Sequence, residues 1–119
     1  MRKVIVSEWT SLDGVVQAPA YADEDTSGGF EHGGWHLRYF DDMSQRWVAD
    51  LHVIGSTRLV RTLIEHDLAD EFRLMIDPVL VGGGKRVFLD DGVLRQLRLT
   101  HSQVTATGAI LATYARAKA

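Results

Sequence analysis

The pattern of apolar and polar positions predicts strands at both ends of the chain and one near its middle. Residues 3–9 contain consecutive β-branched side chains, which is typical of a buried strand. Residues 71–77 alternate between apolar and polar positions, which again predicts a strand. Residues 97–107 and 109–114 predict two further strands, joined at Gly108 as a hairpin.

Between the first and second of these strands the apolar residues recur with helical spacing. Residues 35–51 predict one helix, and a second helix begins after Ser56, a natural N-cap, and ends within residues 67–70. Residues 53–54 are a minimal strand between the two helices. The order of elements predicts one α/β domain over residues 1–119.

Composition narrows the class of protein. The chain has 119 residues, 45% of them hydrophobic and 24% charged, which is ordinary for a globular domain with its own core. A net charge of −3 disfavours nucleic acid and acidic membranes as partners, and no apolar run is long enough for a membrane helix. With no cysteine, the chain is compatible with the cytoplasm, where we expect it.

Two glycine-containing turns are candidate anion sites. Gly55 and Ser56 lie between a strand and a helix, where backbone amides and the helix dipole suit phosphate, although a plain capped turn explains them more simply. Residues 82–86 join three glycines to Lys85 and Arg86. Bare backbone beside two cations suits an anionic ligand, but a flexible hairpin with solvated cations fits equally well.

Two polar clusters carry weaker signals. Ser11, Asp13 and Gly14 follow the first strand, at the rim where α/β sheets bind ligands, and Asp13 could orient a substrate or relay a proton. An Asp-Gly pair is also simply a good turn. His32 and His36 are four residues apart in a glycine-rich loop, and no third ligand is apparent beyond Glu31, so we predict a substrate-lid or packing role there and keep a metal site as the weaker alternative.

Three stretches together resemble a known family. They are VSEWTSLDGVV at the amino end, FEHGGW in the long loop, and IGSTRLVRTLIEHDLADEFRLMIDPVLVGGGKRVF across residues 54–88. They look like the dihydrofolate reductase-like C-terminal domain of bacterial riboflavin-biosynthesis reductases, the RibD C-terminal family. The resemblance implies a mixed sheet with flanking helices, NADPH as cofactor, and a pterin-like or pyrimidine-like heterocycle as substrate.

The resemblance also implies roles for particular residues. The turn at Gly55, Ser56 and Thr57 would face the cofactor phosphates, with Gly82 and Gly83 flanking the same cleft. Asp13 would act in catalysis. The expected substrate contacts are Ser11, Gly14, Trp35, Lys85 and Arg86.

The chain departs from the family pattern in the middle. Members of the family have a strand, a Gly-Arg-x-Thr-Tyr turn, a helix and another strand before the Gly-Ser turn. Here the first predicted helix runs straight into residues 52–55. Loss of central strands would leave unpaired sheet edges, so we expect a homodimer.

Two hypotheses follow. The first is a shortened NADPH-dependent reductase resembling 5-amino-6-(5-phosphoribosylamino)uracil reductase or dihydrofolate reductase. The second is a non-catalytic small-molecule-binding or structural homodimer that has lost turnover, which the missing Gly-Arg-x-Thr turn favours.

Overall fold

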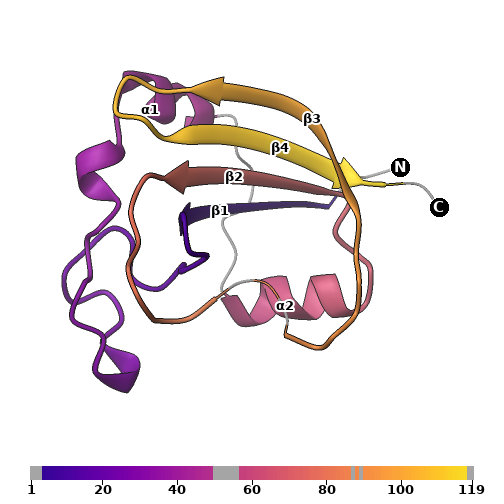
Figure 1. Ribbon diagram of the computed structural model, residues 1–119, viewed down its shortest axis with the longest axis horizontal. Coiled ribbons are helices and arrows are strands. Elements are labelled where there is room, and N and C mark those ends of the chain that lie inside the picture. Colours follow the sequence, from indigo (N-terminus) through magenta and orange to yellow (C-terminus); the bar gives the residue numbers. More distant parts are fainter. Residues whose placement is uncertain (1–3, 50–56, 87, 89, 118–119) are drawn as a thin grey trace.

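The fold is a mixed four-stranded sheet with one helix on each face. The computed structural model describes residues 4–49, 57–86, 88 and 90–117. The strands are β1 (Ile5–Ser11), β2 (Glu71–Asp77), β3 (Leu97–Val104) and β4 (Ile110–Arg116), and the helices are α1 (Asp42–Ala49) and α2 (Thr57–Glu65) (Figure 1). Two short 3₁₀ turns, Ser27–Gly29 and Leu37–Tyr39, interrupt the long loop before α1.

The strand order is β1-β2-β4-β3, with β1 parallel to β2 and the other pairs antiparallel. The parallel register places Ser11 directly beside Asp77, so both strands end at the same edge of the sheet. The loops that leave this edge are therefore brought together. In α/β sheets, this carboxyl edge is where ligands bind.

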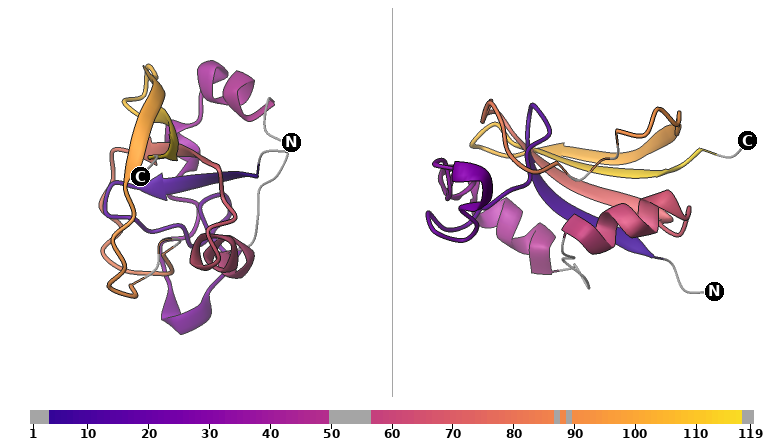
Figure 2. Two further views of the ribbon diagram at one scale, coloured as in Figure 1. Left: turned by 90° about the vertical axis from the view of Figure 1, so that its right-hand side faces the viewer. Right: turned by 90° about the horizontal axis from the view of Figure 1, so that it is seen from below.

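Two apolar clusters divide the core between the sheet faces. Val6 and Phe72 pack with Val60 and Ile64 of α2. Residues with the opposite parity, such as Met75, pack with Trp47 of α1 in a separate cluster. Alternate side chains of a strand point to opposite faces, so the two helices cover opposite sides of the sheet (Figure 2).

Local interactions explain where the helices begin and end. Asp41 caps α1, because its carboxylate accepts hydrogen bonds from the Ser44 amide at 3.0 Å and the Ser44 hydroxyl at 2.9 Å. The chain leaves α2 through a left-handed residue, Asp67, with φ of 55°. The Leu68 amide then donates to the Leu63 carbonyl at 2.8 Å, which is the bond of a Schellman ending.

The predicted α/β order is confirmed, but several boundaries were wrong. The first helix begins at Asp42 instead of residue 35, because the segment before it contains a 3₁₀ turn and an extended Phe40. The strand β1 continues through Ser11, where a turn was expected, because Ser11 still pairs with Asp77. The hairpin turn covers residues 105–109, so β3 ends at Val104. The predicted strand at 53–54 and the Ser56 cap lie outside the described residues.

The two outer strands have one partner each. Among the described residues, β1 pairs only with β2 and β3 only with β4. Every residue of β3 is exposed to solvent. No helix in the described ranges is long and apolar enough to cross a bilayer.

Candidate functional site

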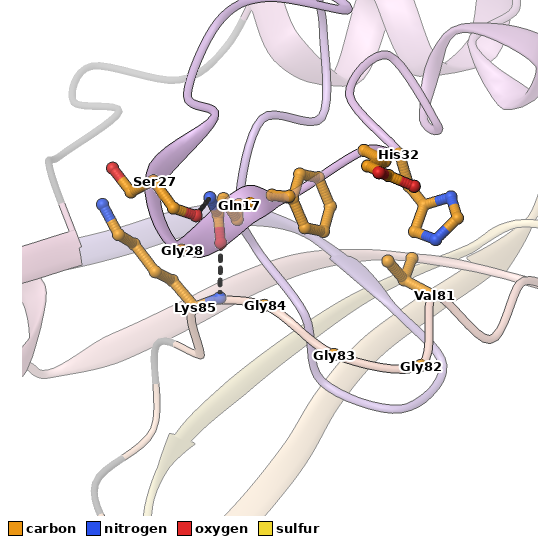
Figure 3. A pocket seen from close by; sticks show the side chains of 12 residues that line it. Gln17, Ser27, Gly28, His32, Val81, Gly82, Gly83, Gly84 and Lys85 are labelled. Atoms are coloured by element: carbon orange, nitrogen blue, oxygen red, sulfur yellow. Dashed lines mark hydrogen bonds between the residues drawn. The ribbon is translucent and has the colours of Figure 1, made fainter.

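A pocket of about 700 Å³ opens where the loop after β2 meets the long loop before α1. Its first wall is the stretch Val81–Lys85 and its second is residues 27–32, with Gln17 between them. In Figure 3, Lys85 and Ser27 lie at one end of the pocket, and His32 and Val81 lie at the other. The structure therefore brings Gly82, Gly83 and Lys85 of the predicted site into one cavity.

Hydrogen bonds from Gln17 hold the two walls together. Its side-chain amide donates to the carbonyl oxygens of Asp25 and Ser27, both at 3.0 Å. Its side-chain oxygen accepts a hydrogen bond from the Lys85 amide at 2.9 Å (Figure 3). Gln17 is 4% exposed, so this linkage is shielded from water. Gln17 was not predicted from the sequence, because no local motif identifies a single glutamine as a link between two loops.

Asp13 anchors the glycine stretch. Its carboxylate accepts hydrogen bonds from the Val81 amide at 3.1 Å and the Gly82 amide at 2.9 Å. The Ser11 hydroxyl donates to the same carboxylate at 2.5 Å. The Ser11 hydrogen bond, followed by those from the two amides, lowers the pKa of Asp13 to about 2. Asp13 is therefore an anion at neutral pH, with both oxygens engaged, and this geometry suits positioning better than proton relay.

The glycine stretch presents bare backbone to the pocket. A Cβ atom at Gly82 or Gly83 would meet no heavy atom within 4 Å, so open space adjoins both residues. Within the described part of the chain, the Gly83 and Gly84 amides donate to no hydrogen-bond partner. Gly84 is the tight position, because a Cβ there would lie 2.9 Å from Phe30 Cε1 of the opposite wall. Free amides in a glycine turn suit an anion such as phosphate.

Lys85 supplies positive charge at the edge of the pocket. Its ammonium group lies 2.6 Å from Asp25 Oδ2, and the two side chains are 49% and 30% exposed. The Lys85 hydrogen bond lowers the pKa of Asp25 to about 2. An exposed ion pair of this kind is weak and can exchange for a ligand anion.

The other four predicted substrate contacts, which include Ser11, do not line the pocket. Trp35 is 9% exposed and its indole N–H donates to the Gln17 carbonyl at 2.8 Å, so it supports the long loop from inside. Arg86 donates from Nη1 to the Asp13 carbonyl. Gly14 has φ of 86° and lies below that guanidinium, where a Cβ would be 3.1 Å from Nη1. Arg86 and Gly14 therefore shape the turn that carries Asp13.

The two histidines considered for a metal occupy different environments. The His32 ring packs edge-on against Phe30 in the pocket wall, whereas His36 is buried and bonded to Asp77. Within the described ranges, no group of three or more histidine, aspartate or glutamate side chains could hold a metal ion. The predicted phosphate turn at Gly55 and Ser56, and the side chain of Thr57, lie outside the described residues.

The described residues therefore form an α/β domain with a pocket whose glycine stretch has the chemistry to suit an anion. The model of the RibD C-terminal domain matches residues 36–111. The chain therefore belongs to the RibD C-terminal domain family, as its sequence motifs suggested. The matched range includes residues 52–55, where the sequence was expected to depart from the family pattern.

One curated relative and two solved structures are similar to this chain. The protein YyaP of Bacillus subtilis (strain 168) is 34% identical over 65 residues, covering 55% of this chain and 35% of that protein. A riboflavin biosynthesis protein of Shewanella sp. PV-4 superposes with a TM-score of 0.64 at 16% identity, covering 98% of this chain and 100% of the other. A pyrimidine reductase-like protein of Corynebacterium diphtheriae has a TM-score of 0.50 at 16% identity, covering 67% of this chain and 37% of the other.

These likenesses confirm the fold. The two solved structures share the mixed sheet with helices, as predicted for a dihydrofolate reductase-like domain. At this level of identity they support the architecture alone. The chain spans about a third of the length of YyaP, 35%.

Proposed function

We propose that this protein is an NADPH-dependent reductase that transfers a hydride to a pterin-like or pyrimidine-like heterocycle. The observation that carries the proposal is the open glycine stretch, where an added Cβ at Gly82 or Gly83 would meet nothing within 4 Å. Family membership supports a reductase, and the cavity of about 700 Å³ is of a size that binds small molecules. The reaction would take place in the cytoplasm, with residues 1–119 acting as one domain.

The residues of the pocket fit an anionic cofactor. The Gly83 and Gly84 amides would contact a phosphate, and Lys85 would neutralise it after leaving Asp25. When bound, NADPH supplies the hydride, and the protein supplies orientation and electrostatics. Asp13 would hold the glycine stretch in the binding conformation through the Val81 and Gly82 amides. We also propose that Gly55, Ser56 and Thr57 add phosphate contacts, and that Ser11, Gly14, Trp35 and Arg86 shape the substrate side.

A titration with NADPH tests the proposal. Gly83→Val should place a branched side chain in the pocket without a clash, because space adjoins Gly83 and its φ is outside the left-handed region. We expect saturable binding to the natural protein and at least about tenfold weaker binding to this variant, equivalent to ~1.4 kcal/mol. Ser102→Val on β3, away from the pocket, is the matched control.

The second candidate is a small-molecule-binding protein without turnover. The observation that favours it is the sparse acid–base chemistry of the described pocket, whose titratable lining residues are Glu31, His32 and Lys85. Cofactor oxidation with an aminopyrimidine substrate separates the two candidates. Binding without oxidation would favour the second, and no binding at millimolar NADPH would refute the reductase.

We further propose that the protein is a homodimer. The exposed strand β3 carries Leu97, Leu99 and Val104 at 39%, 52% and 67% exposure, and its outer edge has no described partner. A free edge with apolar side chains favours association. Light scattering in dilute solution should give twice the chain mass, and a stable monomer would contradict this.

A further inference from the structure

A second hollow, of about 410 Å³, lies between α1 and the sheet, and it shares no residue with the glycine pocket. Six side chains line it. They are Met43, Arg46, Trp47, Arg73, His101 and Gln103. Three of the six are basic residue types and none is acidic. In Figure 1, α1 lies beside the hairpin of β3 and β4, away from α2.

The strand register explains why these groups converge. Arg73 of β2 and His101 of β3 both pair with Thr113 of the intervening strand β4. Neighbouring strands lie about 4.8 Å apart and paired residues share a face, so the two side chains leave the same face about 10 Å apart. In the next row, Gln103 pairs with Leu111. Arg46 and Trp47 face this row from α1.

The cations in this hollow have no acidic partner in the described part of the chain. Among the described residues, the lysine and arginine side chains paired with carboxylates are Lys85, Arg95 and Arg116, and neither Arg46 nor Arg73 is in such a pair. Asp42, one turn before Arg46 on α1, is not among the carboxylates that form ion pairs within the described ranges. Instead, the Arg73 guanidinium lies over the Trp47 ring, 4.9 Å from its centroid. Such a contact orients the guanidinium but leaves its charge unneutralised.

This concentration of positive charge is unusual for a chain with a net charge of −3. Arg46 alone has a simple explanation, because a cation in the last turn of α1 complements the helix dipole. That explanation does not extend to Arg73, which lies mid-strand and is half-buried. Two guanidinium groups that line one hollow repel each other, and an anion bound between them would remove that repulsion.

We propose that this hollow is an accessory binding site for a phosphomonoester. Guanidinium groups present forked N–H donors that match phosphate oxygens, and the amide of Gln103 and the ring of His101 add further donors. The aliphatic side chain of Met43 and the face of Trp47 provide an apolar wall for the organic part of the ligand. A nucleic-acid polymer is a poor fit, because the hollow is small and the whole chain is acidic.

Calorimetric titration tests the site with inorganic phosphate, a pentose 5-phosphate and the same pentose without phosphate. The pentose phosphate should bind in a saturable manner, and the unphosphorylated sugar should not. Arg46→Gln and Arg73→Gln should each weaken binding at least about tenfold, since each removes a charge-assisted donor pair. Arg61→Gln, the same change on the exposed face of α2, is the matched control and should bind like the natural protein.

Further measurements separate this site from the glycine pocket. Binding should persist in Lys85→Gln, because Lys85 belongs only to the other cavity. Circular dichroism must show that Arg73→Gln is folded, and exposed Arg46 gives a second variant that leaves the core untouched. Equal affinity in Arg46→Gln and Arg61→Gln, or loss of binding in Lys85→Gln alone, would overturn the proposal, as would the absence of any saturable binding.

Discussion

His36 and Asp77 share a hydrogen bond of 2.7 Å between Nδ1 and Oδ2, in the interior of the protein. The two residues are 1% and 0% exposed, and the His36 ring stacks on Trp9 with centroids 4.5 Å apart. Burial, partly offset by the His36 hydrogen bond, raises the pKa of Asp77. Asp77 ends β2 and His36 lies in the loop before α1. The pair therefore ties the long loop to the carboxyl edge of the sheet.

Breaking this pair should destabilise the protein. His36→Ala leaves Asp77 without its partner and opens a cavity beside Trp9, so we expect a loss of about 3–5 kcal/mol in the free energy of unfolding. Asp77→Asn keeps an acceptor for the ring and should cost about 1–2 kcal/mol. Urea denaturation measures both values.

The control for these variants is Asp91→Asn. It removes an exposed ion pair with Arg95 on the same chain, and we expect no measurable change in stability. If His36→Ala were as stable as this control, the buried pair would not hold the loop.

Glu8 gives a pH-dependent prediction. Burial raises the pKa of Glu8 from 4.5 to about 7, and its Oε1 has no hydrogen-bond partner among the described residues. The folded state keeps a proton on Glu8 that the unfolded state releases above pH ~4.5, so its contribution to stability falls as pH rises toward 7. Above that pH the cost of the buried charge reaches about 3 kcal/mol.

Glu8→Gln removes this ionisation. We expect it to match the natural protein near pH 4 and to be more stable above pH 7, by up to about 3 kcal/mol. Both proteins contain the same other carboxylates, so the difference between their stabilities removes the contribution of those groups to the pH dependence. This includes Asp77, whose pKa is also raised. Thermal unfolding from acid to mildly basic pH gives the result. A difference that is constant with pH would show that Glu8 does not titrate in this range.

The fold was predictable from the sequence because its signals are local. The alternation in residues 71–77 matches the bounds of β2, Glu71–Asp77, and the glycine at 108 marks the turn of the hairpin. The start of α1 was missed because residues 35–40 have helical apolar spacing but belong to a loop fixed by distant contacts. His36, for example, is held there by Asp77, 41 positions away.

The candidate site was predictable only in part, for the same reason. The sequence predicts part of the pocket because three of its lining residues are close together in the chain: Gly82, Gly83 and Lys85. The second wall, residues 27–32, belongs to a loop whose polar, glycine-rich sequence does not predict which part of the fold it packs against. Gln17 could not be found from the sequence, because its role depends on groups that only the fold brings to it.

The ending of α2 offers a stabilising substitution. Asp67 adopts a φ of 55°, a left-handed conformation that is strained for residues with a Cβ atom. Asp67→Gly should relieve this strain while keeping the Leu68–Leu63 hydrogen bond of 2.8 Å. We expect the free energy of unfolding to rise by about 0.5–1 kcal/mol, after the cost of the greater conformational entropy of the unfolded chain is subtracted. Asp67→Ala should lower stability, and equal stability of the two variants would contradict the explanation.

Substitutions of Asp13 distinguish a role in positioning the glycine stretch from a role in proton transfer. Asp13→Ala removes the acceptor of the Val81 and Gly82 amides, so the glycine stretch should lose its fixed position. We expect NADPH affinity to fall about tenfold, equivalent to ~1.4 kcal/mol, whereas Asp13→Asn keeps one acceptor and should lose less.

The pH dependence of turnover completes this test. With a pKa of about 2, Asp13 stays ionised throughout the neutral range, so it should contribute no step to the pH profile of kcat/KM. Turnover lost in Asp13→Asn, with cofactor affinity unchanged, would instead assign Asp13 to the chemical step. For a positioning residue we expect the reverse: the substitution weakens cofactor binding more than it lowers kcat.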